Sequence, residues 1–358
     1  MYRVRLVQQK DIDKIFRLIK SGTVTMTAMP KTKSDLKKRI KWSNISAKKA
    51  SKSPNHDSYL FVLEKGNQIH GLSAIYTSVS KKKPSVYFKQ QNESYYSKDL
   101  KIKNEFHSLQ LHFVKTPYTE LGTLYIDPKH RGKGGGKLIS FARFMYMSIS
   151  PKRFDRKVFV EIRGHKDKKG STPFWDQFSS HFFDLNFFDA DNISYIDNNF
   201  ISELIPKYPF PIDLMPLKAR QSIGKPHQSS LLAYKLLRDQ SFEPNGLVDV
   251  LDGGPCISAH INNIPFVNTA KSFKIGEIKK FNNPSTKGSF IFKDSLNDFV
   301  ATRADILEID KFETSSKSKQ APKMVRISPT CARLLEVKIG DCIKAVSYTH
   351  LTLPTTAY

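Results

Sequence analysis

Cysteine, tryptophan and acidic residues are scarce in this 358-residue sequence, and long apolar runs are missing. The three cysteines, Cys256, Cys331 and Cys342, are too few and too scattered for a disulfide framework or a zinc site. No uncharged apolar run approaches the roughly 20 residues that a membrane-spanning helix needs. Residues 1–5 lack the apolar core of a signal peptide. We therefore expect a soluble, cytoplasmic protein without a metal site.

Basic residues outnumber acidic ones, with 58 Lys and Arg against 33 Asp and Glu and a formal net charge of +25. Such an excess favours anionic partners, namely nucleic acid, phosphorylated cofactors or a membrane surface. The segment 31–52 is very basic, with Asp35 as its only acid, and it supports one hypothesis, a basic nucleic-acid-binding protein. Lysine is nevertheless spread over all regions and forms no single stripe with aromatic residues. We favour a compositional bias, and we expect no specific nucleic acid and no membrane partner.

The apolar pattern predicts strands that alternate with helices up to about residue 190. Residues 2–7 alternate as in a strand, and Asp11 then caps a helical pattern that runs to Ile19. Further strands are expected at 59–64, 69–77, 121–126 and 157–162. Further helices are expected in the first half of 31–52, with Leu36 and Ile40 on one face, at 137–149, around Phe174, Trp175 and Phe178, and at 229–239. This alternation indicates an α/β or α+β domain.

The second half of the chain differs in its distribution of proline and of strand-like segments. Four prolines between residues 206 and 216 indicate a crossing between lobes, and beyond Pro255 short strand-like runs predict a smaller β-rich lobe. Residues 347–358 lose the lysine-rich character of the rest and resemble a translated read-through tail. We therefore expect domains at 1–205 and 206–346, followed by a non-native tail at 347–358.

The strand at 121–126 runs into a glycine-rich turn that opens a helix. Asp127 and Pro128 end the strand, and residues 131–137 read Arg-Gly-Lys-Gly-Gly-Gly-Lys. Backbone N–H groups at the start of a helix lack intrahelical partners and carry partial positive charge, so phosphates bind there readily. The turn is a candidate phosphate-binding site.

Three glycine motifs compete for this turn, and a flexible basic surface loop is the alternative to all of them. A Walker loop fails because Arg131 stands where its first glycine is needed and Leu138 where Ser or Thr is needed. A dinucleotide-binding fingerprint fails because its third glycine is Lys137. The pattern Arg-x-x-Gly-x-Gly, read as Arg131, Gly134 and Gly136, fits. It resembles the pyrophosphate-binding turn of the GNAT superfamily of acyl-CoA N-acyltransferases.

A wider set of motifs resembles the arginine N-succinyltransferase family. Each motif is weak alone, but they run in family order to about residue 340. They are Thr123-Leu124-x-x-Asp127-Pro128, Arg143-Phe144-Met145, Glu161-x-Arg163-Gly164, Ser171-x-Pro173-Phe174-Trp175, Phe182-Phe183, Glu203-Leu204-x-Pro206-Lys207-x-Pro209, Ile223-Gly224-x-x-His227 and Asp252-Gly253-Gly254-Pro255. The chain departs from the family in its glycine-rich residues 132–136, where members usually have a longer polar segment, and in its high positive charge.

The resemblance implies an α+β, GNAT-like fold, with a mixed, largely antiparallel sheet flanked by helices and a smaller β-rich C-terminal lobe. It implies transfer of succinyl from succinyl-CoA to the α-amino group of L-arginine, the first step of the succinyltransferase route of arginine breakdown. It also implies a homodimer or a dimer with a related subunit. Leu124 would lie at the succinyl-CoA site, and His227 matches the family's proton donor. The coenzyme would be held by the turn residues Arg131, Gly132, Gly134, Gly135 and Gly136.

Acyl transfer to an amine needs a neutral nucleophile, a polarised thioester carbonyl and a proton for the leaving thiolate. His227 and Glu161 are the candidates for moving protons, and a backbone N–H at a bulge near Leu124 is the candidate for holding the carbonyl. Arg163 and Arg131 are available for carboxylates, and Asp252 for the acceptor guanidinium. A GNAT enzyme acting on ornithine or another amine, such as a protein lysine, is the alternative within the same fold.

Overall fold

The computed structural model describes residues 1–21, 29–30, 32–282, 288–309 and 323–346. The chain divides into two compact units, each built from separate stretches of sequence. The first unit contains residues 1–77, 121–156 and 261–358, and the second contains residues 78–120 and 157–260. The expected boundary between residues 205 and 206 falls within the second unit, so this division differs from the expected domains, which stay a prediction. The expected tail, 347–358, lies outside the described residues.

The first unit holds a mixed sheet whose strand order is β14-β15-β11-β16-β12-β13-β1-β2-β3. Neighbouring strands are antiparallel except β11 and β15, which are parallel. The strands are β1 (Arg3–Leu6), β2 (Ser58–Lys65), β3 (Gln68–Val79), β11 (Lys271–Ile278), β12 (Ser289–Lys293), β13 (Val300–Ala304), β14 (Ile306–Ile309), β15 (Lys323–Ile327) and β16 (Cys342–Val346). The last residues of β3 belong to the second unit.

Helices cover this sheet because each presents an apolar face to it. Leu36 and Ile40 of α2 are fully buried with Leu60 of β2 and Leu72 of β3, which confirms the face expected for that helix. The helices are α1 (Ile12–Ser21), α2 (Lys33–Lys48), α3 (Gly135–Ile149), α9 (Pro265–Thr269) and α10 (Pro329–Leu335). Short 3-10 turns lie at Gln9–Asp11, Pro128–His130, Pro151–Arg153 and Ile261–Asn263. None of the helices in the described part of the chain is long and apolar enough to cross a bilayer.

The second unit is built on strands in the order β7-β10-β9-β4-β5-β8. These are β4 (Ser85–Ser97), β5 (Ile102–Val114), β7 (Lys157–Glu161), β8 (Phe210–Pro211), β9 (Glu243–Val248) and β10 (Pro255–His260). The strand β6 (Tyr118–Ile126) begins in this unit, where it runs parallel to β7, and ends in the first unit. The helices of the second unit are α4 (Pro173–Gln177), α5 (Phe187–Ile196), α6 (Asn199–Leu204), α7 (Leu217–Ser222) and α8 (Leu231–Arg238).

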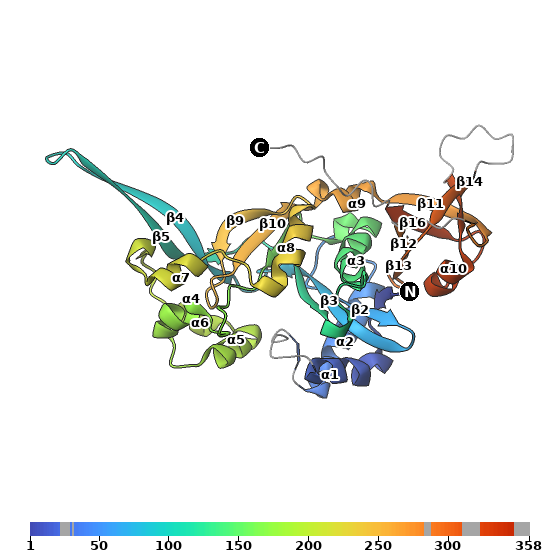
Figure 1. Ribbon diagram of the computed structural model, residues 1–358, viewed down its shortest axis with the longest axis horizontal. Coiled ribbons are helices and arrows are strands. Elements are labelled where there is room, and N and C mark those ends of the chain that lie inside the picture. Colours follow the sequence, from blue (N-terminus) through green and yellow to red (C-terminus); the bar gives the residue numbers. More distant parts are fainter. Residues whose placement is uncertain (22–28, 31, 283–287, 310–322, 347–358) are drawn as a thin grey trace. The chain divides into compact units, whose positions relative to one another are not determined.

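Most of the expected elements are present, but one ends early and several others were not expected, among them helices α5, α6 and α7. The aromatic helix ends at Gln177, one residue before Phe178, whose φ of −143° leaves the helical region. The long hairpin β4–β5, drawn as an extended two-stranded ribbon in Figure 1, was not expected from the sequence. Its outer half is polar and carries exposed side chains, including Tyr95 and Tyr96, so it lacks the buried face that makes a strand recognisable.

A buried ion network ties the first strand of the chain to its neighbours. Both terminal nitrogens of Arg5 donate to the fully buried carboxylate of Asp11, over 2.7 and 2.9 Å, and its Nε donates to Glu64 over 3.0 Å. Arg3 Nε also donates to Glu64 over 2.8 Å. Burial alone would raise the pKa of Glu64, but the hydrogen bonds and charges of Arg5 and Arg3 outweigh it and the pKa is lowered. Glu64 and the two arginines are therefore charged at neutral pH.

Removing one member of such a network leaves an uncompensated buried charge, and this costs about 3–5 kcal/mol. We therefore expect Asp11→Ala to lower the free energy of unfolding by about that amount, measured by urea unfolding followed by circular dichroism. Lys38→Ala, which removes an exposed partner of Asp35, should leave that free energy nearly unchanged. Equal small effects of the two substitutions would show that the network contributes nothing to stability.

Candidate functional site

The glycine turn in the first unit has the strand, turn and helix in the expected order. Strand β6 ends at Ile126, and the Asp127 side chain accepts from Lys129 N over 3.0 Å to cap the 3-10 turn. Gly132 and Gly134 have φ values of +74° and +81°, in the left-handed region that favours glycine. Gly134 is the N-cap of α3, and no side chain caps it. The N-terminus of α3 thus begins at a glycine and has no side-chain cap.

The glycines of the turn serve two different purposes. A Cβ at Gly132 or Gly134 would meet nothing within 4 Å, so these two residues border open space. A Cβ at Gly135 would lie 2.8 Å from Leu63 Cδ2, and one at Gly136 would lie 3.0 Å from Ile126 Cδ1. Gly135 and Gly136 therefore let α3 pack closely on β2 and β6.

A cavity of about 570 Å³ lies beside the start of α3 within the first unit. The turn contributes Lys133 and Gly134 to its wall, and the C-terminal part of the unit contributes two further cations, Lys280 and Arg303. Arg131, the other cation expected at the turn, donates from Nε to the carbonyl of Ile126 over 3.3 Å. Asp305 also lines the cavity, so its wall carries an acid as well as these cations.

The strand before the turn departs from its extended course next to Leu124. Thr123 has a φ of +54°, a conformation that costs a non-glycine residue about 1–3 kcal/mol and persists only where the surroundings hold it. The Thr123 hydroxyl accepts from Arg39 over 3.0 Å and is hydrogen-bonded to Tyr76 OH at 2.9 Å. Leu124, the next residue, is 36% exposed. The irregular backbone at Thr123 therefore lies next to Leu124, where the sequence predicted a bulge.

In the second unit Glu161 ends strand β7 beside two tyrosines. Tyr87 OH donates to its carboxylate over 2.5 Å, and Tyr118 OH is hydrogen-bonded to Tyr87 OH at 2.9 Å. Glu161 is an exposed residue, but many protein atoms surround its carboxyl. These surroundings and the neighbouring Asp249 raise the pKa of Glu161 to about 7, against the opposing effect of the Tyr87 hydrogen bond. The carboxyl can therefore exchange protons near neutral pH.

Asp249 shares this environment. Burial and the charge of Asp252 raise its pKa to about 7, although its carboxylate accepts from the backbone N–H groups of Leu251 and Asp252 over 2.8 and 2.9 Å. Asp191 also adds negative charge to the group. Glu161, Asp249 and Asp191 form a set of acids that would favour a cationic ligand.

Asp252 joins two segments of the expected site. Its carboxylate accepts from Gly164 N over 2.7 Å and from Gly254 N over 2.8 Å. A Cβ at Gly254 would lie only 2.1 Å from the carbonyl oxygen of Ile162, so the two backbones approach each other more closely than any other residue allows. The motifs around Glu161 and Asp252, 91 positions apart in sequence, are thereby packed together.

A third segment, carrying His227, is attached to the same place by backbone bonds. His227 N donates to the carbonyl of Arg163 over 2.7 Å, and Gly224 N donates to that of Gly253 over 2.8 Å. The guanidinium of Arg163 lies 3.9 Å from the carboxylate of Asp191. The structure thus brings Glu161, Arg163, Asp252 and the His227 segment together in the second unit.

The surroundings of His227 determine the charge and the tautomer of its imidazole. Its Nδ1 accepts from Ser229 N over 3.1 Å and lies 2.7 Å from the Ser229 hydroxyl. Burial, followed by the charges of Arg163, Lys166 and His165, lowers its pKa. The imidazole is therefore neutral at pH 7, and its proton lies on Nε2 because Nδ1 accepts a hydrogen bond.

Sequence reasoning did not single out Tyr87, Tyr118, Asp249 or Asp191. Tyr87 and Tyr118 lie in the region around the unexpected hairpin, where no motif marked them. Asp249 precedes the Asp252-Gly253-Gly254 motif by three residues, and this proximity was the one available signal.

Comparisons with known proteins agree with one another. The family model for the arginine N-succinyltransferase beta subunit matches residues 2–266. An arginine N-succinyltransferase of Yersinia pestis is 30% identical over 97% of this chain and 98% of its own, and the arginine N-succinyltransferase subunit alpha of Pseudomonas aeruginosa is 30% identical over 97% and 100%. The solved structure of arginine/ornithine succinyltransferase subunit AI from P. aeruginosa is 27% identical, covers 97% of this chain and 98% of its own, and has a TM-score of 0.82.

The fold and the family model define an acyltransferase with a GNAT-like fold. A β-rich C-terminal part, β11 to β16, accompanies it, as expected. The chain belongs to the arginine N-succinyltransferase family.

The role of Asp252 in joining the segments can be tested through stability. Asp252→Ala leaves two backbone N–H groups without their acceptor, and each such loss costs about 1–3 kcal/mol. We expect a fall of about 2–6 kcal/mol in the free energy of unfolding, measured by denaturant titration. Glu105→Ala, on the exposed part of the hairpin, is the control and should change little. A variant as stable as the control would show that Asp252 does not hold the segments.

Proposed function

We propose that this chain transfers the succinyl group from succinyl-CoA to the α-amino group of L-arginine. The match to relatives of that name over nearly their whole length supports the reaction. Within the chain, the proposal rests on the raised pKa of Glu161, an exposed residue whose carboxyl has a pKa of about 7. Ornithine is a second candidate acceptor, because the P. aeruginosa structure is named for both amino acids.

The first unit binds the donor in this proposal. The pyrophosphate of the coenzyme lies against the N–H groups at the start of α3, with Gly132 and Gly134 leaving room for it. Arg131, with the cations of the adjoining cavity, neutralises its phosphates. The backbone beside Leu124 binds the acyl-pantetheine end, because the irregular strand at Thr123 frees a backbone group to hold the thioester carbonyl.

The second unit carries the proton transfers. Glu161 takes a proton from the α-ammonium group, and the neutral amine then attacks the thioester carbon. A C–N bond forms and the C–S bond breaks. His227 gives its Nε2 proton to the departing sulfur, and the amine's second proton replaces it on the same nitrogen. The products are the amide and free coenzyme A. Tyr87 positions Glu161 through its hydrogen bond.

Charge in the second unit suits an amino acid that has a cationic side chain. Arg163 offers its guanidinium to a carboxylate, of the acceptor or of the succinyl group. Asp249 and Asp191 supply negative charge near Glu161. Asp252, expected to bind the acceptor guanidinium, already accepts two backbone hydrogen bonds, and its role toward the acceptor stays a prediction. The dimer and the cytoplasmic location also stay predictions.

An assay of free thiol released from succinyl-CoA tests the proposal. Arginine, ornithine and lysine serve as parallel acceptors, and acetyl-CoA serves as the control donor. We expect release with succinyl-CoA and arginine above all other pairs. Absence of release, together with tight binding to one DNA sequence at about 150 mM salt, would favour the nucleic-acid-binding alternative, because binding driven by charge alone is sequence-blind and falls steeply with salt.

The pH dependence of kcat/KM tests Glu161. Below about pH 7 the carboxyl holds its proton and cannot act as a base, so kcat/KM should rise as the pH passes through about 7. Glu161→Gln should abolish this rise and lower kcat by about 10²- to 10⁴-fold. Tyr87→Phe removes a hydrogen bond that lowers the pKa, so the midpoint should move to higher pH. An unchanged midpoint in Tyr87→Phe would remove Glu161 as the titrating group.

Substitution of His227 tests the second proton carrier. His227→Ala should lower kcat by about 10²- to 10⁴-fold while the melting temperature changes little. His227→Gln, which keeps hydrogen bonding but carries no proton, should be nearly as impaired. Loss of stability with normal turnover per folded molecule would instead assign His227 a structural role.

A further inference from the structure

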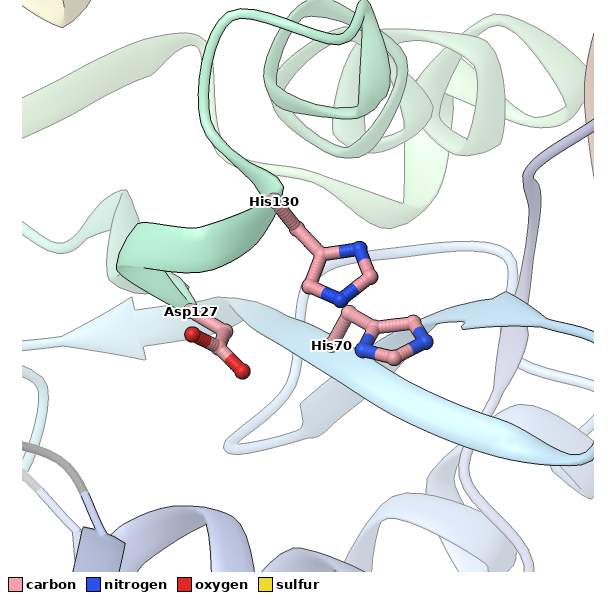
Figure 2. Close-up of side chains that lie close together, drawn as sticks. All are labelled: His70, Asp127 and His130. Atoms are coloured by element: carbon pink, nitrogen blue, oxygen red, sulfur yellow. The ribbon is translucent and has the colours of Figure 1, made fainter.

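Two histidines and an aspartate from the first unit meet near the end of strand β6. His70 lies on β3, Asp127 caps the 3-10 turn, and His130 ends that turn. One ligand atom from each lies within 4.8 Å of the others. Figure 2 shows the two imidazoles stacked, with the Asp127 carboxylate beside them. The ring centroids are 3.6 Å apart and the planes are inclined by 20°.

Pairing of the strands creates this cluster. Asp127 N donates to the carbonyl of His70 over 2.8 Å, which fixes the two residues side by side although 57 positions separate them in sequence. His130 follows Asp127 by three residues within the same turn, so it reaches the same point. None of the three was a candidate for function in the sequence, because no metal-binding spacing links them.

Each of the three side chains has an outer partner that orients it. Tyr2 OH is hydrogen-bonded to Nδ1 of His130 at 2.8 Å. A ring nitrogen of His70 is hydrogen-bonded to the backbone of Lys65. Asp127 accepts from Lys129 N over 3.0 Å. Histidine ligands of metals regularly hydrogen-bond to a second partner through their other nitrogen, which fixes the tautomer and the ring orientation.

We propose that His70, His130 and Asp127 form a binding site for a divalent transition-metal ion of the zinc type. Two imidazoles and one carboxylate are a ligand set that such ions accept, with an open fourth position. Donor atoms in a tetrahedral zinc site lie about 3.3 Å apart, so small side-chain rotations bring these three to the required separation.

Metal titration of the whole chain tests this site. Protein treated with EDTA is titrated with Zn²⁺ by calorimetry and with Co²⁺ by visible absorption, which reports tetrahedral coordination. We expect one ion per chain and a rise in melting temperature. His70→Gln, His130→Gln and Asp127→Asn should each weaken binding about 100-fold or more. Tyr2→Phe, which leaves the three ligands intact, should weaken it by about 10-fold.

Two variants outside the cluster serve as controls. His107→Gln removes an exposed histidine and Cys342→Ser an exposed thiol, and both should bind the ion as the unsubstituted chain does. Binding that survives all three ligand substitutions, or that is lost in Cys342→Ser, would overturn the proposal. So would failure to bind either ion at about 100 µM. Circular dichroism of each variant distinguishes loss of the metal site from loss of the fold. Tyr2→Phe tests the site while leaving all three proposed ligands in place.

Discussion

The hydrogen bonds from Gly164 N and Gly254 N to the carboxylate of Asp252 are the constraint on which the second unit's site depends. They hold two backbones so close that a Cβ on Gly254 would overlap the carbonyl of Ile162. The segment bearing His227 is attached to these two by further backbone bonds. The positions of Glu161, Arg163 and His227 therefore follow from backbone groups that are held by the Asp252 carboxylate and by one another.

The pKa values of the groups in this site are set by the protein atoms and charges packed around them. Glu161 and Asp249 would ordinarily be ionised at neutral pH. The surrounding protein, together with the charge of Asp249 on Glu161 and of Asp252 on Asp249, raises the pKa of each to about 7. Burial acts in the opposite direction on His227, where the surrounding cations add to its effect and the pKa falls. One environment thus gives a carboxyl that can accept a proton near pH 7 and an imidazole that is neutral there.

In the first unit, the turn combines open space with close packing. Gly132 and Gly134 adopt positive φ values and border space, whereas Gly135 and Gly136 allow helix α3 to contact Leu63 and Ile126. A single glycine-rich stretch therefore both presents the helix N-terminus and fixes its distance from the sheet. The strained Thr123, held by Arg39 and Tyr76, places the strand irregularity just before this turn.

The sequence by itself determined what depends on local pattern. Apolar periodicity predicted β1, β2, β3, β6 and β7 and helices α1, α2, α3 and α8, and the motif at residues 131–136 predicted the strand, turn and helix. The order of the family motifs indicated the family that the comparisons show. These features are legible because each lies within a short stretch and requires particular residue types there.

Tertiary structure alone decided what depends on contacts between distant stretches. It joined Tyr87 to Glu161, put Asp249 beside both Glu161 and Asp252, and stacked His70 on His130, and no spacing in the sequence records these pairings. The discontinuous units likewise follow from which strands pair, and the polar hairpin β4–β5 is stabilised by its own ladder, with no apolar pattern over its outer half. A pKa depends on everything packed around a group, so the chemistry of Glu161 could be read only after folding had assembled its neighbours.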